Sequence, residues 1–208
     1  MKRAKVYTIT GLLLVAAALL LSGYNLLLSR HAGKAADNVL DELRPQISEA
    51  VPMPDLSNGG SLNEVNLPFY AVDPNIPMPV RWVGDVEYIG TLQLPTLGLE
   101  LPISSLYSMD LLNVAPCRYY GSAYLDNLVI CAHNFDYHFG RLKNLRLDDS
   151  VIITDVEGNE FDYRVMEIEK LEPDQDEEML TADTWDLTLF TCTVGGASRV
   201  AVRCEKLK

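Results

Sequence analysis

Residues 187–192, Leu187-Thr188-Leu189-Phe190-Thr191-Cys192, form a short run of β-forming residues that ends on a thiol. Alternation along a strand places Cys192 on the same face as Phe190 and turns Thr191 to the other face. A loop with two adjacent glycines, residues 193–198, follows, and a second strand-like run begins at Arg199. Two strands joined in this way can bring Cys192 and Arg199 side by side. A cysteine at a strand end is usually a small buried hydrophobe, so this segment alone does not establish a site.

A second run, residues 127–134, reads Asn-Leu-Val-Ile-Cys-Ala-His-Asn and is an apolar strand that ends on His133. An imidazole at the rim of a sheet can titrate or act as a base. A histidine at a strand end is more often structural, so this signal is also weak by itself. His138, a few residues further along, is expected to be an exposed loop residue.

The thiol, the imidazole and a guanidinium are chemically consistent as one site. A cysteine is a useful nucleophile only as its thiolate, which a nearby imidazolium and guanidinium favour. The guanidinium can also stabilise the oxyanion of an acyl-transfer intermediate. Cys192, His133 and Arg199 therefore indicate cysteine-dependent acyl transfer. Arg203 shares the alternation parity of Arg199 and is its main rival, but Arg199 is nearer the loop and hence nearer Cys192.

The C-terminal part of the chain consists of short strand-like runs separated by turn residues. The runs with strand composition cover residues 88–94, 97–103, 128–132, 151–155, 160–170, 187–192 and 199–204. Helical segments are few and short, the clearest lying near residues 139–145. Seven or so strands predict a mainly β domain, either a barrel or a sandwich, and residues 81–208 are enough chain for one closed core.

The first thirty residues differ from the rest of the chain. Residues 1–5 carry three cations, and residues 6–28 carry no charge. At about 1.5 Å per residue this run makes a helix of roughly 34 Å, which is enough to cross a hydrocarbon core of about 30 Å. The three cations before it, with His31 or Lys34 after it, favour an amino terminus inside the cell and a C-terminal domain outside. We expect a single-pass signal-anchor in the lipid bilayer of the cell membrane; a cleaved signal peptide, with its shorter apolar region, is the alternative.

Between the anchor and the β-rich part lies a segment with the composition of a stalk. Residues 30–50 are polar and loosely helical, with an interruption at Pro45, and seven of the eleven prolines lie between positions 45 and 79. The alternative for its end is an ordered arm, residues 67–70, because Phe69 and Tyr70 are costly to expose. The predicted organisation is a cytoplasmic tail (1–5), a transmembrane helix (6–28), an extracellular stalk (29–80) and a catalytic domain (81–208).

Charge and cysteine content exclude several classes of partner. Seventeen Lys and Arg residues oppose 29 Asp and Glu residues, giving a net charge of −12, so the chain lacks the basic face that nucleic acid requires. We expect no metal and no cofactor, because no His or Cys cluster has the spacing of a zinc site. The acidic stretch 171–185 could bind calcium, although a solvated loop is the favoured interpretation. We do not expect Cys117 and Cys131 to form a disulfide.

These residues resemble the sortase family. Thr188-Leu189-Phe190-Thr191-Cys192 matches the TLxTC signature of sortases at every fixed position, His133 stands at the end of the strand where that family places its histidine, and Arg199 follows on the next strand. The anchor, the stalk and the β-rich domain fit as well. The resemblance implies a closed eight-stranded sortase-like β-barrel with short helices, on the outer face of a Gram-positive-type membrane.

The resemblance also implies the chemistry of a cysteine transpeptidase. Cys192 attacks the Thr–Gly bond of an LPxTG-like sorting signal and forms a thioacyl intermediate. His133 protonates the leaving amine and later deprotonates the incoming one, while Arg199 steadies the carbonyl and the oxyanion. An amine from a cell-wall precursor or a pilin lysine then resolves the intermediate, which anchors the protein at the cell surface. The residues expected from their position alone to bind substrate are Thr191, Ala132 and Asn134.

The chain departs from the sortase pattern in places that affect specificity and subclass. Ala132 stands where sortases commonly have glycine before the histidine, and Gly195-Gly196 stands where several classes carry bulkier residues. The interval 171–185 is too short for the long inserted helix of the class B enzymes, and the chain stops at Lys208 without a second apolar segment. A small class D-like or class A-like form is therefore favoured.

Other function classes stay open at this point. A catalytically inactive, membrane-tethered β-barrel binding module would keep the fold and would tolerate replacement of Cys192 by Ala. A plain cysteine peptidase or an L,D-transpeptidase is a second alternative. The latter family places its Cys and His close together in one motif, whereas His133 and Cys192 are far apart in this chain.

Overall fold

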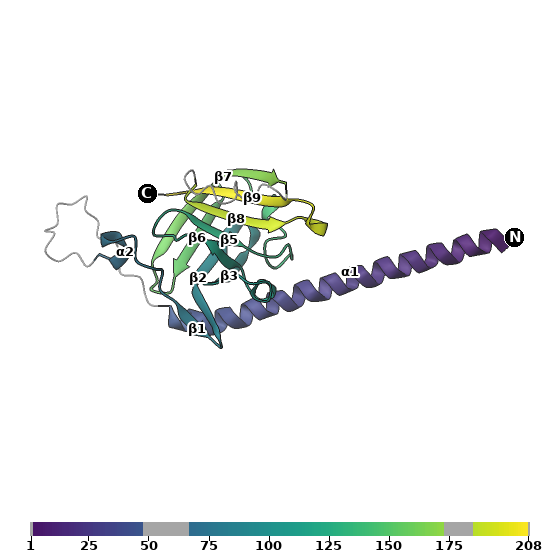
Figure 1. Ribbon diagram of the computed structural model, residues 1–208, viewed down its shortest axis with the longest axis horizontal. Coiled ribbons are helices and arrows are strands. Elements are labelled where there is room, and N and C mark those ends of the chain that lie inside the picture. Colours follow the sequence, from purple (N-terminus) through teal and green to yellow (C-terminus); the bar gives the residue numbers. More distant parts are fainter. Residues whose placement is uncertain (1, 48–66, 173–184, 208) are drawn as a thin grey trace.

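A long helix and a β-barrel make up the chain, as seen in a computed structural model that describes residues 2–47, 67–172 and 185–207 (Figure 1). The helix, α1 (Lys2–Leu43), extends far beyond the barrel at its N-terminal end and runs along the barrel at its C-terminal end. The central part of the predicted stalk, residues 48–66, and most of the predicted acidic loop, residues 173–184, lie outside the described residues.

The strands that the structure describes form a single antiparallel and parallel sheet in the order β1-β2-β3-β4-β5-β8-β9-β7-β6. β2 also pairs with β6, so the eight strands from β2 to β9 close into a barrel and β1 extends it at one edge. The predicted eight-stranded barrel is confirmed. The strand bounds are β1 (Arg81–Val83), β2 (Val86–Leu94), β3 (Leu99–Ser104), β4 (Cys117–Tyr120), β5 (Leu128–Cys131), β6 (Ser150–Asp155), β7 (Glu160–Leu171), β8 (Leu187–Cys192) and β9 (Arg199–Lys206).

Most of these strands lie where the sequence predicts them, and β8 has the predicted bounds. β1 and β4 are not predicted, since they are only three and four residues long and β4 carries an irregularity between Arg118 and Tyr120. The helical segment expected near residues 139–145 is one 3-10 turn, η6 (Leu142–Asn144). The other short turns are η1 (Arg44–Gln46), α2 (Phe69–Val72), η4 (Pro95–Leu97), η5 (Leu111–Asn113) and η7 (Val194–Gly196).

Closure of the barrel depends on a glycine in β2. Gly90 faces both Ile103 of β3 and Asp155 of β6, at a register shift in β2. Its φ is 152°, and a Cβ added there would lie 2.0 Å from the carbonyl oxygen of Thr154. Glycine is therefore required where β6 approaches β2 and closes the barrel, as is usual for a bulge that bends a barrel strand.

The interior of the barrel is filled by aliphatic and aromatic side chains from β2, β3 and β5 to β9. Leu187 and Leu189 of β8 belong to this main core, together with Ile130 of β5 and Val202 of β9. On the outer face of the same strands, Phe190 packs in a smaller apolar cluster with Cys131. Both faces of β8 are buried up to Thr191, and only its last residue, Cys192, is exposed.

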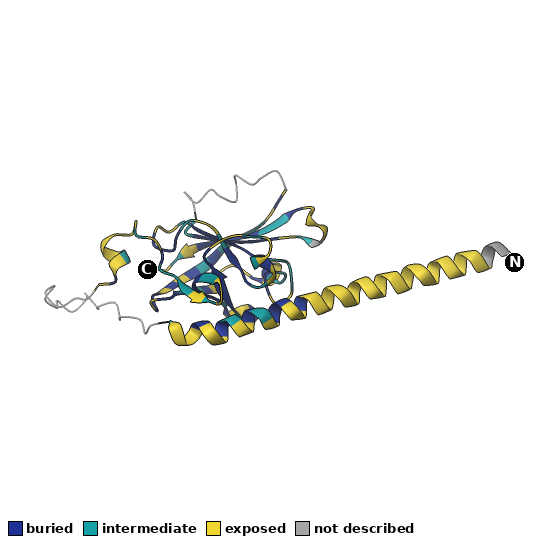
Figure 2. Cartoon of the chain, turned by 60° about the horizontal axis from the view of Figure 1, so that its bottom comes forward, coloured by how far each residue is buried: buried dark blue, intermediate teal, exposed yellow. Residues whose placement is uncertain are grey.

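The helix α1 has two parts with different surroundings. Residues 5–28 are exposed along their whole length, and this apolar segment is long enough to span a membrane (Figure 2). From Ser29 onward one face of the helix is buried against the barrel, through Ser29, Ala32, Ala36, Leu40 and Leu43. The segment predicted as the loosely helical start of the stalk is therefore a regular helix that is docked on the barrel over residues 29–43.

The segment after the undescribed residues returns to the barrel through one aromatic side chain. Tyr70 stacks on Tyr124 with ring centroids 4.6 Å apart and lies 5.2 Å from Phe161. Phe69, its neighbour, is 79% exposed. Of the two interpretations of residues 67–70, the ordered arm is the one found, although Tyr70 anchors it without Phe69.

Docking of α1 requires a small residue where the helix crosses the loop after β5. A Cβ at Gly33 would lie 2.8 Å from Cγ of Tyr137, whereas a Cβ at Gly23 would meet nothing within 4 Å. We predict that Gly33→Leu lowers the free energy of unfolding by about 1 to 3 kcal/mol, because the helix or the loop must move apart. Thermal unfolding of the full chain in detergent tests this, with Gly23→Leu as the matched control. Equal midpoints for the two variants would contradict the close approach.

Candidate active site

Three strands bring the residues singled out in the sequence to one rim of the barrel. β5 pairs with β8 in parallel, with Cys131 opposite Phe190, so both strands end at the same edge. The amide of Ala132 continues this pairing by donating to the carbonyl of Phe190 at 3.2 Å. β9 runs antiparallel to β8, and its first residue, Arg199, is the direct partner of Cys192. His133, Cys192 and Arg199 therefore come from three adjacent strand ends.

The loop between β8 and β9 is tied at its base, which fixes the pair Cys192 and Arg199. The amide of Thr193 donates to the carbonyl of Ser198 at 2.7 Å, and the amide of Ser198 donates to Oγ1 of Thr193 at 3.1 Å. The turn between them uses Gly195 and Gly196, with φ values of 83° and 71°, where a side chain would be strained. The glycine pair noted in the sequence is thus explained by backbone conformation.

Thr191 connects β8, which ends at Cys192, to the segment that carries His133. Its hydroxyl donates to the carbonyl of Ala132 at 2.8 Å and is buried. Ala132 is also buried, so it is a structural link between Thr191 and His133. This hydrogen bond fixes the backbone directly before His133 relative to the backbone directly before Cys192.

The imidazole of His133 is half-buried and lies against Phe135, with ring centroids 4.8 Å apart. Its loop folds back on itself, since the amide of Phe139 donates to the carbonyl of His133 at 3.1 Å. Burial lowers the pKa of His133 below its ordinary value. The neutral imidazole is therefore favoured at neutral pH, as a group that takes up and releases protons requires.

A cavity of about 370 Å³ opens beside Cys192. It is lined by the predicted residues Asn134, Thr191 and Cys192, and also by Asp136 and Lys143. Among the described residues, His133, Arg199 and Ala132 are not part of its lining. A second cavity of about 400 Å³ shares Asn134 and Asp136 with the first and reaches α1 at Asn25, Leu26 and Ser29. Asn134 and Asp136 therefore form a wall shared by the cavity beside the thiol and the cavity at the base of the exposed part of α1.

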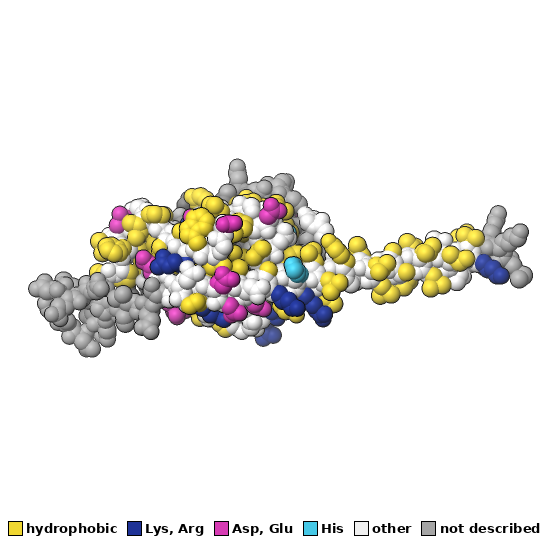
Figure 3. Space-filling model, turned by 90° about the horizontal axis from the view of Figure 1, so that it is seen from below, with side chains coloured by type: hydrophobic (Ala, Val, Ile, Leu, Met, Phe, Trp, Pro, Cys, Tyr) yellow, Lys and Arg dark blue, Asp and Glu magenta, His cyan; other side chains and the backbone are white. Residues whose placement is uncertain are grey.

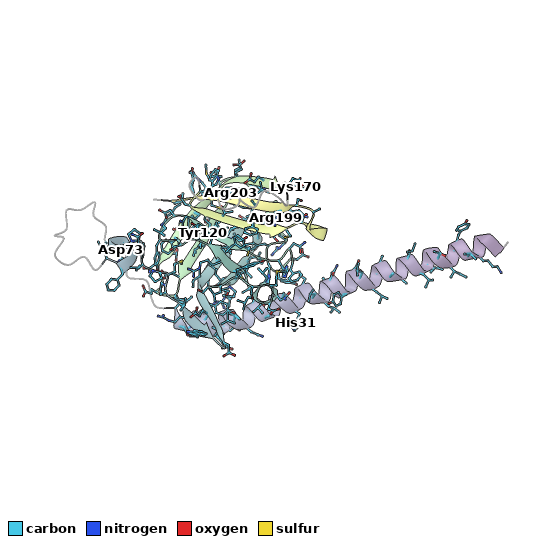
Figure 4. The ribbon with its side chains drawn as sticks, in the orientation of Figure 1. His31, Asp73, Tyr120, Lys170, Arg199 and Arg203 are labelled. Carbon is cyan, nitrogen blue, oxygen red and sulfur yellow. The ribbon has the colours of Figure 1, made fainter. Side chains whose placement is uncertain are left out.

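The two arginines of β9 have different environments (Figure 4). Arg203 is buried in the sheet, where its Nε donates to Glu169 at 2.7 Å and its Nη1 donates to Oγ1 of Thr188 at 3.0 Å. Arg199 is half-buried at the end of β9 next to the loop. Arg203 thus stabilises the strands, which leaves Arg199 as the guanidinium at the rim.

Cys192 is the exposed thiol among the four cysteines, all of which are free. Cys117, Cys131 and Cys204 are buried, and burial raises the pKa of the Cys117 thiol to about 11. The pKa values of Cys131 and Cys204 are raised further for the same reason. These three thiols stay protonated at neutral pH. Of the four cysteines, Cys192 is the one that is exposed and lines the cavity.

His138 is not the exposed loop residue that the sequence predicts. Its side chain is fully buried, and the backbones of Ala32 in α1 and of Val114 lie close to its imidazole. Burial lowers the pKa of His138 to about 4, and the nearby His133 adds to the shift. The error has a physical reason, because the packing of α1 over the loop has no signal in the local sequence of residues 134–140.

The part of the chain that the structure describes has no group of three or more His, Cys, Asp or Glu side chains placed to hold a metal ion. The acidic residues that could bind calcium lie mostly in residues 173–184, outside that part.

Comparison with known proteins gives a match to a family and to solved structures. The family model of the sortase domain matches residues 92–207, more than half of the chain. No curated protein sequence matches the chain significantly. Similar crystal structures include sortase C1 from Streptococcus suis (25% identity, TM-score 0.50, covering 58% of this chain and 73% of that one). The type I structure of Streptococcus agalactiae sortase C1 has 24% identity and a TM-score of 0.51, covering 58% and 69%. A Clostridium perfringens sortase D5 transpeptidase has 22% identity and a TM-score of 0.50, covering 58% and 79%.

We predict that acid destabilises the chain through His138. Its pKa is lower in the folded chain than the ordinary 6.5, so the stability present above pH 6.5 is lost as the pH falls toward 4. The loss from this residue amounts to about 3 kcal/mol, and His133 acts in the same direction. Unfolding midpoints between pH 7 and pH 4 should fall less steeply in His138→Met than in the parent chain. His31→Gln, at an exposed histidine, is the control, and equal slopes in all three would contradict the assignment.

Substitutions of Arg203 and Arg199 should differ in their effect on the free energy of unfolding. Arg203→Gln leaves the Glu169 carboxylate and the Thr188 hydroxyl without their partner inside the sheet, and we expect it to lower the free energy of unfolding by about 3 kcal/mol. Arg199→Gln, at the rim, should change it by less than about 1 kcal/mol. Denaturant unfolding of both variants tests the difference. A larger loss for Arg199 than for Arg203 would reverse the assignment of structural and chemical roles.

Proposed function

This chain belongs to the sortase family, and we propose that it is a membrane-anchored cysteine transpeptidase with Cys192 as nucleophile, His133 as general acid and base, and Arg199 as oxyanion stabiliser. The observation that supports this most directly is the strand pairing at the rim. Cys192 and Arg199 are direct cross-strand partners, and β5 ends beside them on the other side of β8. A structural cysteine would not need to be the one exposed thiol at such a junction.

The proposed reaction has two acyl-transfer steps. The Cys192 thiolate attacks the carbonyl carbon of the Thr–Gly bond in an LPxTG-like signal, and Arg199 donates hydrogen bonds to the oxyanion that forms. The C–N bond then breaks, the leaving amine takes a proton from the His133 imidazolium, and a thioester to Cys192 remains. An amine nucleophile attacks this thioester, His133 takes its proton, and the new amide leaves as the thiolate is released.

The lowered pKa of His133 has a consequence for this sequence of steps. The imidazolium that protonates the leaving amine is the minority form at neutral pH, because burial disfavours it. The same shift makes the neutral imidazole available to deprotonate the incoming amine in the second step. One histidine thus serves both steps without a second base.

The substrate segment is proposed to bind in the cavity beside Cys192. Asn134 and Thr191 line that cavity, and Ala132 contributes through the backbone that Thr191 fixes. The acceptor is an amine of a cell-wall precursor or of a pilin, and the product is a protein attached to the cell surface. The class D-like or class A-like form stays a prediction, since the similar structures carry the names of sortases C1 and D5.

The site is proposed to face the outside of a Gram-positive-type cell. The apolar segment of α1 is long enough to cross a bilayer, and three cations precede it. The positive-inside preference then keeps the N-terminus in the cytoplasm and the barrel outside. Sorting signals on membrane-associated proteins would reach the barrel on that side.

The proposal is tested with the full chain in detergent, because residues 29–43 of α1 are packed into the catalytic domain. LPxTG-like and NPxTG-like peptides are added with and without an amine acceptor, and the intact protein is weighed by mass spectrometry. We expect an acyl adduct that the amine removes, that is absent in Cys192→Ala and that is retained in Cys204→Ala, at a buried thiol. No adduct with any peptide, together with a Cys192 that alkylates no faster than free cysteine, would favour the binding-module alternative.

Arg199 is tested by the rate of the same reaction. Arg199→Ala should lower kcat/KM on the order of a hundredfold to a thousandfold, as removal of an oxyanion donor does. Arg199→Lys should restore part of the rate, because it keeps the charge but loses the forked geometry. Rates within about twofold of the parent for both variants would remove Arg199 from the mechanism.

A further inference from the structure

The apolar segment of α1 ends where the barrel begins. Residues 6–28 carry no charge and are exposed, and Ser29, the next residue, is already buried against the barrel. α1 is one unbroken helix across this point. When residues 6–28 span the bilayer, as in the proposed function on which this inference rests, the part of the barrel around Ser29 lies at the level of the lipid headgroups.

Basic side chains gather at this junction from two separate elements. One cavity, of about 530 Å³, is lined by Arg30, His31 and Lys34 of α1 together with Asp37 and Tyr137. A neighbouring cavity, of about 560 Å³, shares Arg30 and Tyr137 and adds Arg141, Lys143 and Asp136 from the loop after β5. Figure 3 shows Lys and Arg side chains collected where the helix leaves the barrel. Among the described residues that line these two cavities are four permanent cations, Arg30, Lys34, Arg141 and Lys143, and two carboxylates, those of Asp37 and Asp136.

Neither the composition nor the topology of the chain accounts for this cluster. The chain has a net charge of −12, so an excess of cations on one face is contrary to its average. The positive-inside preference disfavours Lys and Arg next to the outer end of a spanning helix. Within the described residues, no ion pair involves Arg30, Lys34 or Lys143, so internal salt bridges do not explain them either.

We propose that Arg30, Lys34, Arg141 and Lys143 bind the phosphate groups of anionic phospholipids in the bilayer that α1 spans. Cations close to a membrane surface are attracted to anionic headgroups, and Arg and Lys are the side chains that bind phosphate best. Tyr137 is 47% exposed between the two cavities, where an amphipathic ring fits the interface between headgroups and acyl chains. Arg141 is held in place by its Nε, which donates to the carbonyl of Asp136 at 3.0 Å.

This contact orients the active site as well as the barrel. Asp136, Gly140 and Lys143 line both the lipid-facing cavity and the cavity of Cys192. The loop that carries the lipid-binding cations is therefore a wall of the proposed substrate site. Bound headgroups hold that wall against the membrane, so the thiol meets substrates that are themselves at the membrane surface.

Hydrogen exchange of the full chain in lipid nanodiscs tests the proposal. One set of nanodiscs contains phosphatidylcholine alone, and the other contains phosphatidylcholine with phosphatidylglycerol at about 30%. We expect phosphatidylglycerol to slow exchange of the amides in residues 134–144 on the order of fivefold for each engaged cation, and high salt to abolish the effect. The double variant Arg141→Gln with Lys143→Gln should lose most of this protection.

The matched control removes two charges elsewhere, with Arg81→Gln and Lys170→Gln, and it should keep the full protection. Equal exchange in both lipid compositions, or equal protection in the two double variants, would overturn the proposal. Protection in pure phosphatidylcholine by added glycerophosphate would show a site for soluble phosphate and would also contradict it. A chain that does not enter nanodiscs of either composition would refute the membrane anchor itself, which distinguishes that failure from the failure of lipid recognition.

Discussion

The parallel pairing of β5 with β8 is the constraint on which the candidate site depends. Parallel strands end at the same edge of a sheet, so residues that follow β5 and residues that end β8 meet although they are distant in the chain. The antiparallel return of β9 then places Arg199 opposite Cys192. The hydrogen bond from Thr191 to the carbonyl of Ala132 fixes the pairing of β5 with β8 directly before His133. Barrel closure at Gly90 holds this arrangement from the far side, because it prevents the sheet from opening.

The sequence predicted those parts that have a local signal. The sequence predicts β8 to the residue because a short run of strand-forming residues is bounded by a glycine loop, and the choice of a barrel over a sandwich rests on the family signature. β1 and β4 were missed because three or four residues cannot show a period. Thr191 is predicted from its position to bind substrate and lines the cavity beside Cys192, but the hydrogen bond from its hydroxyl to Ala132 depends on a partner in another strand and has no local signal. His138 was expected in solvent, since nothing near it in the chain indicates that a distant helix covers it.

For a reason that concerns composition, the sequence predicts a loose helix over residues 30–50 but not the docking of this part of α1 on the barrel. Its buried face consists largely of small residues, Ser29, Ala32, Gly33 and Ala36, which give little hydrophobic periodicity. Such residues allow a helix to approach a surface closely, and here that surface is the loop that carries His133. The result is that residues 29–43 of α1, the buried His138 and the loop beside the thiol pack together. Residues 29–43, which the sequence predicts as part of a stalk, therefore both continue the apolar helix and pack against the barrel.

Within the residues described, α1 is one unbroken helix from the apolar segment to Leu43. It therefore connects the apolar segment to the barrel rigidly and not as a flexible linker. Rotation of the apolar part about its own axis turns the barrel by the same angle. The direction in which the Cys192 cavity opens therefore depends on how many residues of the helix precede the barrel. Each residue inserted near position 28 would turn the barrel by about 100° and raise it by about 1.5 Å relative to the bilayer. In the proposed membrane-anchored form, the number of residues between the basic N-terminal residues and Ser29 therefore determines both the height of the Cys192 cavity above the bilayer and the direction in which that cavity opens.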